Sequence, residues 1–255
     1  MTRCRPAGPL VLLHGFLGRP ASWDGVLARL RELPAEPHRW SLPGHGPDPA
    51  PVGERFVDAV ERIHAALPEG RCWLAGYSMG ARIALALAVL HPERIRGAVL
   101  VGPDVGLRDE GARATRRGWE QAQAETIEVH GVDRFVAAWE DLPIFDSQKA
   151  LPAERLAAQA RQRRDHTAAG IAAAMRILGT GSMPSFWEGL AACPVELRFL
   201  AGGLDAKFTA VGREAARIAP RATFRSVDGA GHNLLLERPE AVAEEIRDMI
   251  AREYR

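Results

Sequence analysis

The five residues GYSMG at positions 76–80 fit the pattern G-x-S-x-G, which places a serine on a sharp turn between a strand and a helix. The β-rich run RCWLA at 71–75 comes directly before them, and a helical pattern continues from Met79 to His91. Small residues are needed here because the backbone turns too tightly for neighbouring side chains. We therefore expect Ser78 to stand above the edge of a sheet, with the N–H of Met79 turned toward it.

The strand before Ser78 is one of several short runs that alternate with helical patterns along the chain. The expected strands are 9–13, 38–42, 71–75, 97–101, 195–200 and 222–227, and the expected helices lie near 22–32, 54–67, 79–91, 210–219 and 239–252. Alternation of this kind indicates a mostly parallel sheet with helices on both faces. The sequence therefore predicts an α/β fold.

One interval, residues 104–190, breaks this alternation. It contains amphipathic helical stretches separated by Pro143, Pro152 and Pro184, and no convincing strand. We predict that it is a helical cap inserted into a single core domain formed by residues 1–103 and 191–255. Insertions over the carboxyl edge of a sheet usually shape the entry of a substrate.

Composition narrows the class of protein. A formal net charge of +1 gives no electrostatic footprint for nucleic acid. The three cysteines, Cys4, Cys72 and Cys193, lie far apart without metal-ligand spacing, which favours free thiols in a reducing compartment. The apolar runs at 10–13 and 83–90 are too short for a signal-peptide core or a membrane span. We expect a soluble cytoplasmic protein with no metal, no cofactor and no membrane insertion.

A second chemical signal is GAGHN at 229–233, after the last expected strand. Small residues let this loop bend and present His232 toward Ser78. An imidazole titrates near neutrality, so it can accept a proton and return it. The histidines other than His14 lack this context, and we expect them to be packing or surface residues.

An acid that orients His232 is expected between Ser78 and the histidine, because the partners of a G-x-S-x-G serine follow it in the chain order Ser, Asp, His. Asp205 follows the expected strand 195–200 and has the right place in that order. Its carboxylate would fix the histidine tautomer and stabilise the imidazolium. Asp104, at the end of another strand, is the alternative.

The loop His14-Gly15-Phe16 follows the first expected strand. The N–H of Phe16, together with the N–H of Met79, would form an oxyanion hole. We expect the side chain of His14 to brace this loop. The sequence LPGHG at 42–46 is a tight turn after the second strand, and a structural role is sufficient for it.

Taken together, these motifs resemble the α/β-hydrolase superfamily. Further residues resemble one branch of it, the menaquinone-pathway 2-succinyl-6-hydroxy-2,4-cyclohexadiene-1-carboxylate synthases. They are Arg82 in GYSMGAR, Trp139 with LPIF at 142–145, GTG at 179–181 with PSFW at 184–187, DAKF at 205–208 and GHN at 231–233.

The resemblance implies elimination of pyruvate from a tricarboxylated cyclohexene without a metal or organic cofactor. Ser78, made basic by His232 and Asp205, would remove a ring proton, and the amides of the oxyanion hole would stabilise the developing charge. Nucleophilic attack by Ser78 on an ester, thioester or ketone is the alternative mechanism.

A substrate with several carboxylates calls for arginines that bind them bidentately. The resemblance places these at Arg82, Arg116 and Arg164, with Trp139 and Tyr77 lining the pocket.

Two other classes of protein remain open from the sequence. A carboxylesterase or carbon–carbon bond hydrolase would use the same three residues behind a mainly apolar entrance. A non-catalytic binding protein would be expected to have lost Ser78, Asp205 or His232, and all three are present. The sequence leaves the oligomeric state open.

Overall fold

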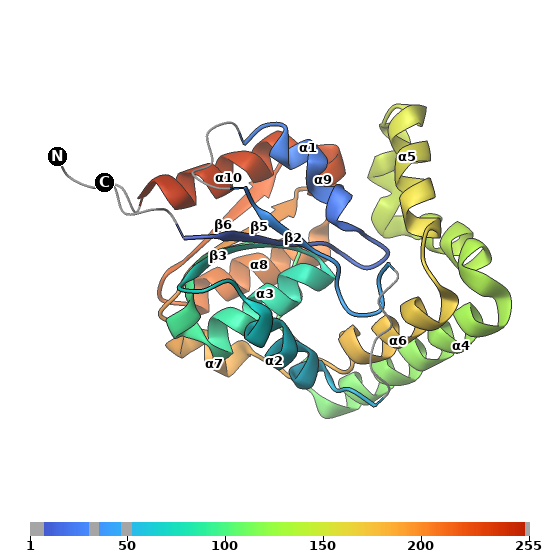
Figure 1. Cartoon of the computed structure of the whole chain (residues 1–255), viewed down its shortest axis with the longest axis horizontal. Coiled ribbons are helices and arrows are strands. Elements are labelled where there is room, and N and C mark those ends of the chain that lie inside the picture. The colour runs from blue at the N-terminus through green and yellow to red at the C-terminus, as the bar shows by residue number, and fades with distance from the viewer. Residues whose placement is uncertain (1–7, 31–35, 47–52, 253–255) are drawn as a thin grey trace.

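The computed structural model describes residues 8–30, 36–46 and 53–252, and its centre is one parallel sheet (Figure 1). The strand order is β2-β1-β3-β4-β5-β6, and every neighbouring pair is parallel. The strands are β1 (Leu10–Leu13), β2 (His38–Trp40), β3 (Cys72–Tyr77), β4 (Ile95–Val101), β5 (Glu196–Gly202) and β6 (Ala222–Val227). All six predicted strands form, and the predicted α/β class is confirmed.

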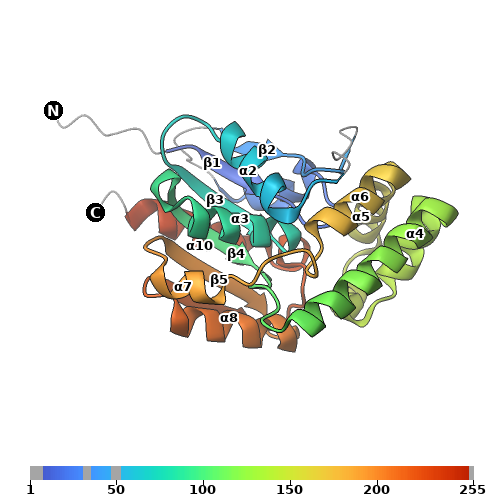
Figure 2. The same cartoon turned by 90° about the horizontal axis from the view of Figure 1, so that it is seen from below.

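Helices cover both faces of the sheet (Figures 1 and 2). One face carries α2 (Phe56–Ala66), α3 (Met79–Leu90), α7 (Trp187–Ala192) and α8 (Ala206–Ile218). The other carries α1 (Asp24–Leu27), α9 (Leu234–Glu237) and α10 (Pro239–Arg252). The short 3-10 helices are η1 (Pro20–Trp23), η2 (Pro92–Arg94) and η3 (Pro143–Ala150).

The central strands are buried on both faces, as the strands of a covered parallel sheet must be. In β1, Val11 and Leu13 pack under α2 and α3, whereas Leu10 and Leu12 pack against the opposite helices. This alternation follows from the two-residue period of a strand. Because the strands are parallel, the carboxyl ends of β1, β3, β4 and β5 lie at one edge of the sheet, where the polar residues gather.

Between β4 and β5 the chain forms the helices α4 (Glu110–Glu140), α5 (Ala153–Arg164) and α6 (Ala168–Leu178). They stand beside the sheet, on the right in Figure 2. The helices α4 and α6 share an apolar cluster that includes Ile127, Phe135 and Ile171, and Leu17 from the loop after β1 joins it. In α5, by contrast, the only buried residue is Arg163.

Two helices differ from the sequence prediction. The helix expected at 22–32 is described only as η1 followed by α1, and residues 31–32 lie outside the described residues. The helix α9, directly after His232, was not predicted because four residues are too few to show a helical period.

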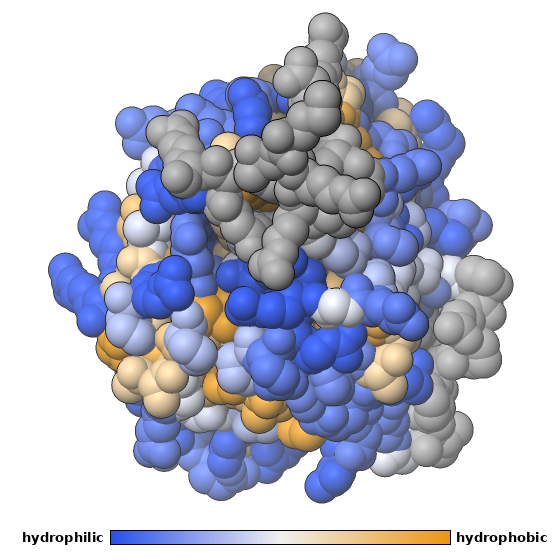
Figure 3. Space-filling model, turned by 60° about the vertical axis from the view of Figure 1, so that its left-hand side comes forward, coloured by the Kyte–Doolittle hydropathy of each residue, from blue (hydrophilic) through white to orange (hydrophobic). Residues whose placement is uncertain are grey.

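Three further features are the cysteines, the hydropathy of the surface and the length of the helices. Cys72 and Cys193 are free and buried, and Cys4 lies outside the described residues. The face in Figure 3 is largely hydrophilic, with small groups of apolar residues between polar ones. Among the described residues, none of the helices has the length and apolarity needed to cross a membrane.

Candidate active site

Ser78 occupies the turn between β3 and α3 in a backbone conformation that L-residues rarely adopt, with φ 52° and ψ −107°. Its N–H donates to the carbonyl of Val101 at 2.8 Å, which fixes the turn to β4. A Cβ at Gly76 would lie 2.4 Å from the carbonyl oxygen of Gly80, and one at Gly80 would lie 2.2 Å from that of Leu13. The two glycines of the motif are therefore required by close backbone contacts.

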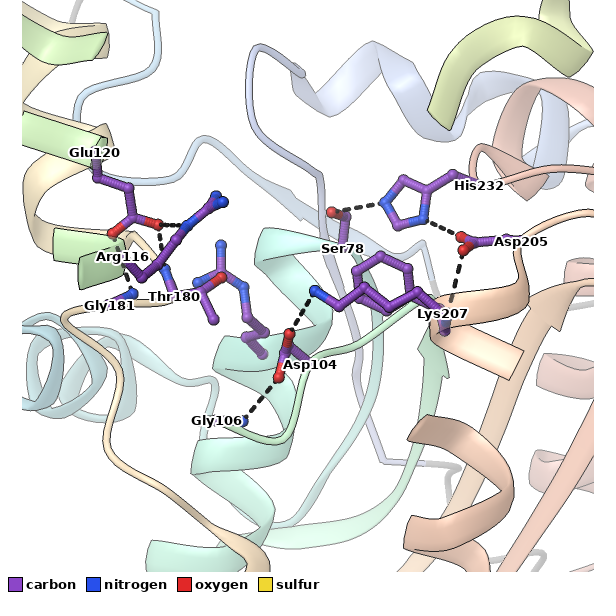
Figure 4. A network of polar contacts seen from close by, with 12 residues as sticks. Ser78, Asp104, Gly106, Arg116, Glu120, Thr180, Gly181, Asp205, Lys207 and His232 are labelled. Atoms are coloured by element: carbon purple, nitrogen blue, oxygen red, sulfur yellow. Dashed lines mark hydrogen bonds and ion pairs between the residues drawn. The ribbon is translucent and has the colours of Figure 1, made fainter. Parts of the chain in front are cut away.

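The side chains of Ser78, His232 and Asp205 form a hydrogen-bonded chain (Figure 4). The Nε2 of His232 lies 3.0 Å from Oγ of Ser78, and its Nδ1 lies 2.7 Å from Oδ2 of Asp205. The other carboxylate oxygen of Asp205 accepts from the N–H of Phe208 at 3.3 Å, at the start of α8. The helix thus holds the carboxylate, and the carboxylate holds the imidazole. The geometry suits proton transfer between serine and histidine.

Asp104, the alternative acid, faces different partners (Figure 4). Its Oδ2 accepts from Nζ of Lys207 at 3.0 Å, and its Oδ1 accepts from the N–H of Gly106 at 3.1 Å. The structure pairs Asp205, and not Asp104, with His232.

The loop after β1 bends into a turn in which the N–H of Gly18 donates to the carbonyl of Gly15 at 2.9 Å. Phe16 and Leu17 are the central residues of this turn, and Leu17 has φ 58°. Across the cavity, Met79 is the first residue of α3, so its N–H has no partner within the helix. Phe16 and Met79 both line the cavity above Ser78, where their amides suit an oxyanion hole.

Two buried histidines brace this loop. The Nε2 of His14 accepts from the N–H of Leu42 at 3.1 Å, so its Nδ1 donates to the carbonyl of Gly15 at 2.8 Å. The Nε2 of His45 accepts from the N–H of Leu17 at 3.1 Å. Burial, the largest cause, lowers the pKa of His14 to about 4 and the pKa of His45 well below its usual value. Both rings are neutral at pH 7 and act structurally.

A cavity of about 1050 Å³ opens above Ser78 between the sheet edge and the helices α4, α5 and α6. Its apolar wall includes Phe16, Tyr77 and Trp139, and the rings of Phe16 and Trp139 are 5.2 Å apart. The cations among its lining residues are Arg19, Arg29, Arg82, Arg116, Arg155, Arg161, Arg163 and Lys207. The cavity therefore combines a hydrophobic surface with an excess of positive groups, which suits an anionic organic molecule.

Of the three arginines predicted from the sequence, Arg82 is the most buried, at 8% exposure. It lies in the first turns of α3, and its Nη1 donates to the carbonyl of Leu178 at 2.7 Å. Burial lowers the pKa of Arg82 to about 10, with the carboxylates of Glu120 and Asp104 opposing the shift. The guanidinium remains charged at pH 7.

Arg116 lies on α4, where it contacts Glu120 (Figure 4) and the ring of Trp119. Its Nε donates to Oε1 of Glu120 at 2.7 Å, and its guanidinium stacks on the ring of Trp119 at 4.2 Å. Glu120 is itself buried and accepts from the N–H groups of Thr180 and Gly181. The sequence pattern did not indicate Glu120, because a glutamate on an amphipathic helix is normally a surface residue.

Arg164 does not line the cavity in the described structure, but its neighbour Arg163 does. Arg164 points toward Glu140 and the carbonyl of Ala160, at 3.2 and 3.1 Å. Arg163 is buried, with its guanidinium 4.7 Å from the ring of Phe145. Successive residues of a helix point about 100° apart, so a shift of one position decides which arginine faces the cavity. We therefore transfer the proposed binding role from Arg164 to Arg163.

Lys207 is a second cavity residue to which the sequence reasoning assigned no role. Its Nζ pairs with Asp104 and lies 4.7 Å from the ring of Phe208. Its position two residues after Asp205 could have indicated this role, because the first turn of a helix that starts at the sheet edge faces the same cavity.

Comparison with known proteins agrees with this arrangement. Residues 10–245 match the alpha/beta hydrolase family. A protein of Bacillus subtilis (strain 168), named putative 2-succinyl-6-hydroxy-2,4-cyclohexadiene-1-carboxylate synthase, is 32% identical over 251 residues, which cover 94% of this chain and 89% of that protein. The synthase of that name from Serratia proteamaculans (strain 568) is 32% identical over 245 residues, covering 94% and 92%.

A solved structure gives the same relationship. The structure of MenH from S. aureus superposes with a TM-score of 0.90 at 29% identity, covering 99% of this chain and 97% of that one. The agreement includes the helices between β4 and β5, since nearly all of both chains is covered. The chain therefore belongs to the alpha/beta hydrolase family and, within it, to the 2-succinyl-6-hydroxy-2,4-cyclohexadiene-1-carboxylate synthases.

Proposed function

We propose that this chain eliminates pyruvate from 2-succinyl-5-enolpyruvyl-6-hydroxy-3-cyclohexene-1-carboxylate, in the menaquinone pathway. The observation that carries the proposal is the position of the Ser78–His232–Asp205 chain at the base of a cavity that also holds Arg82 and Arg116. The synthase of Serratia proteamaculans and the MenH structure match 94% and 99% of this chain.

The proposed reaction uses Ser78 as a base. The proton of its hydroxyl moves to Nε2 of His232, which lies 3.0 Å away, and Oγ takes a proton from the substrate ring. The electrons of that C–H bond form a new ring double bond, the existing ring double bond shifts by one position, and the C–O bond to the enolpyruvyl group breaks. The leaving group gains the proton from His232 and becomes pyruvate by tautomerisation. No acyl-enzyme forms in this sequence.

Asp205 supports the proton transfer electrostatically. Its carboxylate accepts from Nδ1 of His232, which keeps the lone pair of Nε2 directed at Ser78. Once His232 carries both protons, the buried carboxylate stabilises the positive charge. The amides of Phe16 and Met79 would stabilise the negative charge that develops on the substrate.

The carboxylates of the substrate would be bound by Arg82, Arg116 and Arg163. Their guanidinium groups already have fixed positions, through Leu178, Glu120 and Phe145 respectively. A preorganised guanidinium loses little side-chain entropy when it binds a carboxylate. Tyr77 and Trp139 would hold the ring. We further propose that residues 104–190 act as the cap of this site.

The proposed setting follows from the substrate. A molecule with several carboxylates does not cross a membrane unaided, so the enzyme would meet it in the cytoplasm. The formal net charge of +1 gives no attraction for nucleic acid. A small polycarboxylate is the partner that the cavity favours.

The experiment that tests the proposal is a coupled assay for pyruvate released from the enolpyruvyl substrate, with wild type and Ser78→Ala. We expect fast release by wild type and its loss in the variant. If wild type releases no pyruvate but hydrolyses a p-nitrophenyl ester, the chain is a serine hydrolase and the proposal is wrong.

A further inference from the structure

Away from the cavity, three metal-ligating side chains meet where α2 packs beside the end of α3. Glu61 and His64 are three residues apart on α2 and so share a helix face. His91 comes directly after α3 and is its C-cap residue. One ligand atom from each of the three residues lies within 4.8 Å of the others.

The two imidazole rings are stacked almost parallel, with centroids 3.6 Å apart and 6° between the planes. The carboxylate of Glu61 lies opposite both rings. Its Oε1 is 2.9 Å from Nε2 of His91, and its Oε2 is 3.9 Å from Nδ1 of His64. One nitrogen of each ring therefore faces the same carboxylate.

We propose that Glu61, His64 and His91 bind a divalent transition-metal ion of the zinc class. Zinc prefers nitrogen and oxygen ligands about 2.0–2.2 Å away, so two ligand atoms of a tetrahedral site are about 3.3 Å apart. The separations of 2.9 and 3.9 Å in the cluster lie on either side of that value. The side chain of Glu61 is 48% exposed and can rotate to even them out. The two stacked rings must also turn out of their parallel arrangement, so that one nitrogen of each points at the ion. The fourth position would hold water.

A second carboxylate lies near His91, beyond hydrogen-bond distance. The Oε1 of Glu93 is 3.9 Å from Nδ1 of His91, the ring nitrogen that would not bind the ion. Histidine ligands usually donate this second N–H to a carboxylate, which fixes the tautomer. In His64, Nε2 has no hydrogen-bond partner among the described residues, so no acceptor determines which tautomer its ring adopts.

The surrounding charges leave room for a cation. Arg94, the nearest residue of η2 with a positive charge, donates to the carbonyls of Gly70 and Pro68. Arg62, the neighbour of Glu61, donates to Glu54. Both guanidinium groups thus have other acceptors.

The position of the cluster indicates its effect. Ser78 precedes the first residue of α3 and His91 follows the last, so about 18 Å of helix separates the cluster from the reaction site. An ion bound here would join α2 to the end of α3. It would stabilise the fold without taking part in the reaction.

The test is a zinc titration by calorimetry on protein without a histidine tag. Wild type should bind one Zn²⁺ per chain, and Glu61→Gln, His64→Gln and His91→Gln should each weaken binding at least about tenfold. Glu61→Gln leaves both rings in place, so it separates lost ligation from a disturbed helix end. The unfolding midpoint should rise in zinc for wild type and stay unchanged for these three variants.

The matched control is His130→Gln, which removes an exposed histidine from α4. It should bind zinc as wild type does and show the same rise in the unfolding midpoint. Far-UV circular dichroism checks that every variant is folded. The proposal is wrong if wild type shows no saturable one-to-one binding, or if the double variant of His64 and His91 still binds as wild type does.

Discussion

The Oδ2 of Asp205 lies 2.7 Å from Nδ1 of His232, and the side chains of both residues are only 5% exposed. A carboxylate placed so close and so far from solvent fixes one tautomer of the imidazole. While it is ionised, the carboxylate also stabilises the positive charge that the ring gains with its second proton. The acid is therefore expected to control the orientation of His232 and to stabilise the imidazolium that forms during proton transfer.

Asp205→Asn should lower the turnover of pyruvate release by about a thousandfold to ten-thousandfold. The amide can keep the hydrogen bond, but it offers no negative charge and can hold the wrong tautomer. The control is Asp104→Asn, which faces Lys207 and leaves the acid of His232 intact. Steady-state kinetics with both variants decides the assignment, and an Asp205→Asn enzyme with more than a tenth of wild-type turnover would contradict it.

The backbone of Ser78 leads to an expectation about stability. Its φ of 52° is strained for any residue with a Cβ, and glycine relieves that strain. Ser78→Ala and Ser78→Gly should both lose turnover by orders of magnitude. Ser78→Gly should nevertheless exceed Ser78→Ala in free energy of unfolding by about 1 kcal/mol. Urea unfolding of the two variants measures the difference, and equal values would mean that the turn is not strained.

Neighbouring arginines on α5 form a matched pair. Both contact Glu140, but only Arg163 lines the cavity, whereas Arg164 also donates to the carbonyl of Ala160. If Arg163 binds a substrate carboxylate, Arg163→Ala should raise KM about tenfold to a hundredfold. Arg164→Ala should change KM less than about threefold, since Arg164 is not among the residues that line the cavity. The reverse order would restore the role to Arg164.

The sequence predicted what depends on local backbone geometry. The G-x-S-x-G turn and the strand periodicity are encoded in neighbouring residues, so the strands and the position of Ser78 followed from them. His232 and Asp205 could be selected because each lies in the loop after a strand, and parallel strands bring those loops to one edge. Asp104 met the same condition, and the observed contacts separate the two, since Asp205 pairs with His232 and Asp104 pairs with Lys207.

The details that depend on helix rotation or on distant contacts were not accessible in this way. Arg163 and Arg164 differ by one residue, and no periodic pattern fixes the rotation of the polar helix α5. His64 and His91 are 27 positions apart and meet only because α2 packs against α3. Such contacts are set by tertiary packing, which local sequence does not report.

The histidines around the loop after β1 form a chain that extends to the segment between α5 and α6. The rings of His45 and His14 are 4.9 Å apart, and those of His45 and His166 are 5.4 Å apart. His166, which follows α5, accepts from the N–H of Gly46 at 3.1 Å. Burial is the largest cause that lowers the pKa of each of the three rings. Protonation of His45 would remove the acceptor of the Leu17 N–H.

These histidines should make the protein less stable in mild acid. A histidine with a lowered pKa in the folded state stays neutral, while the unfolded chain takes up a proton below about pH 6.5. The unfolded state then binds more protons, so the free energy of unfolding falls as pH drops from 6.5 toward 4, the value to which the pKa of His14 is lowered. Each such ring contributes a slope of up to about 1.4 kcal/mol per pH unit.

His45→Gln tests this expectation, because the amide oxygen of glutamine can replace Nε2 as the acceptor of the Leu17 N–H without taking up a proton. Urea unfolding between pH 5 and 6.5 should show a shallower dependence on pH for this variant than for wild type. His130→Gln, at an exposed position on α4, should keep the wild-type slope. If His45→Gln keeps it too, then His45 must be protonated in the folded protein at pH 5, and the neutral histidine contacts between this loop and His166 do not persist in mild acid.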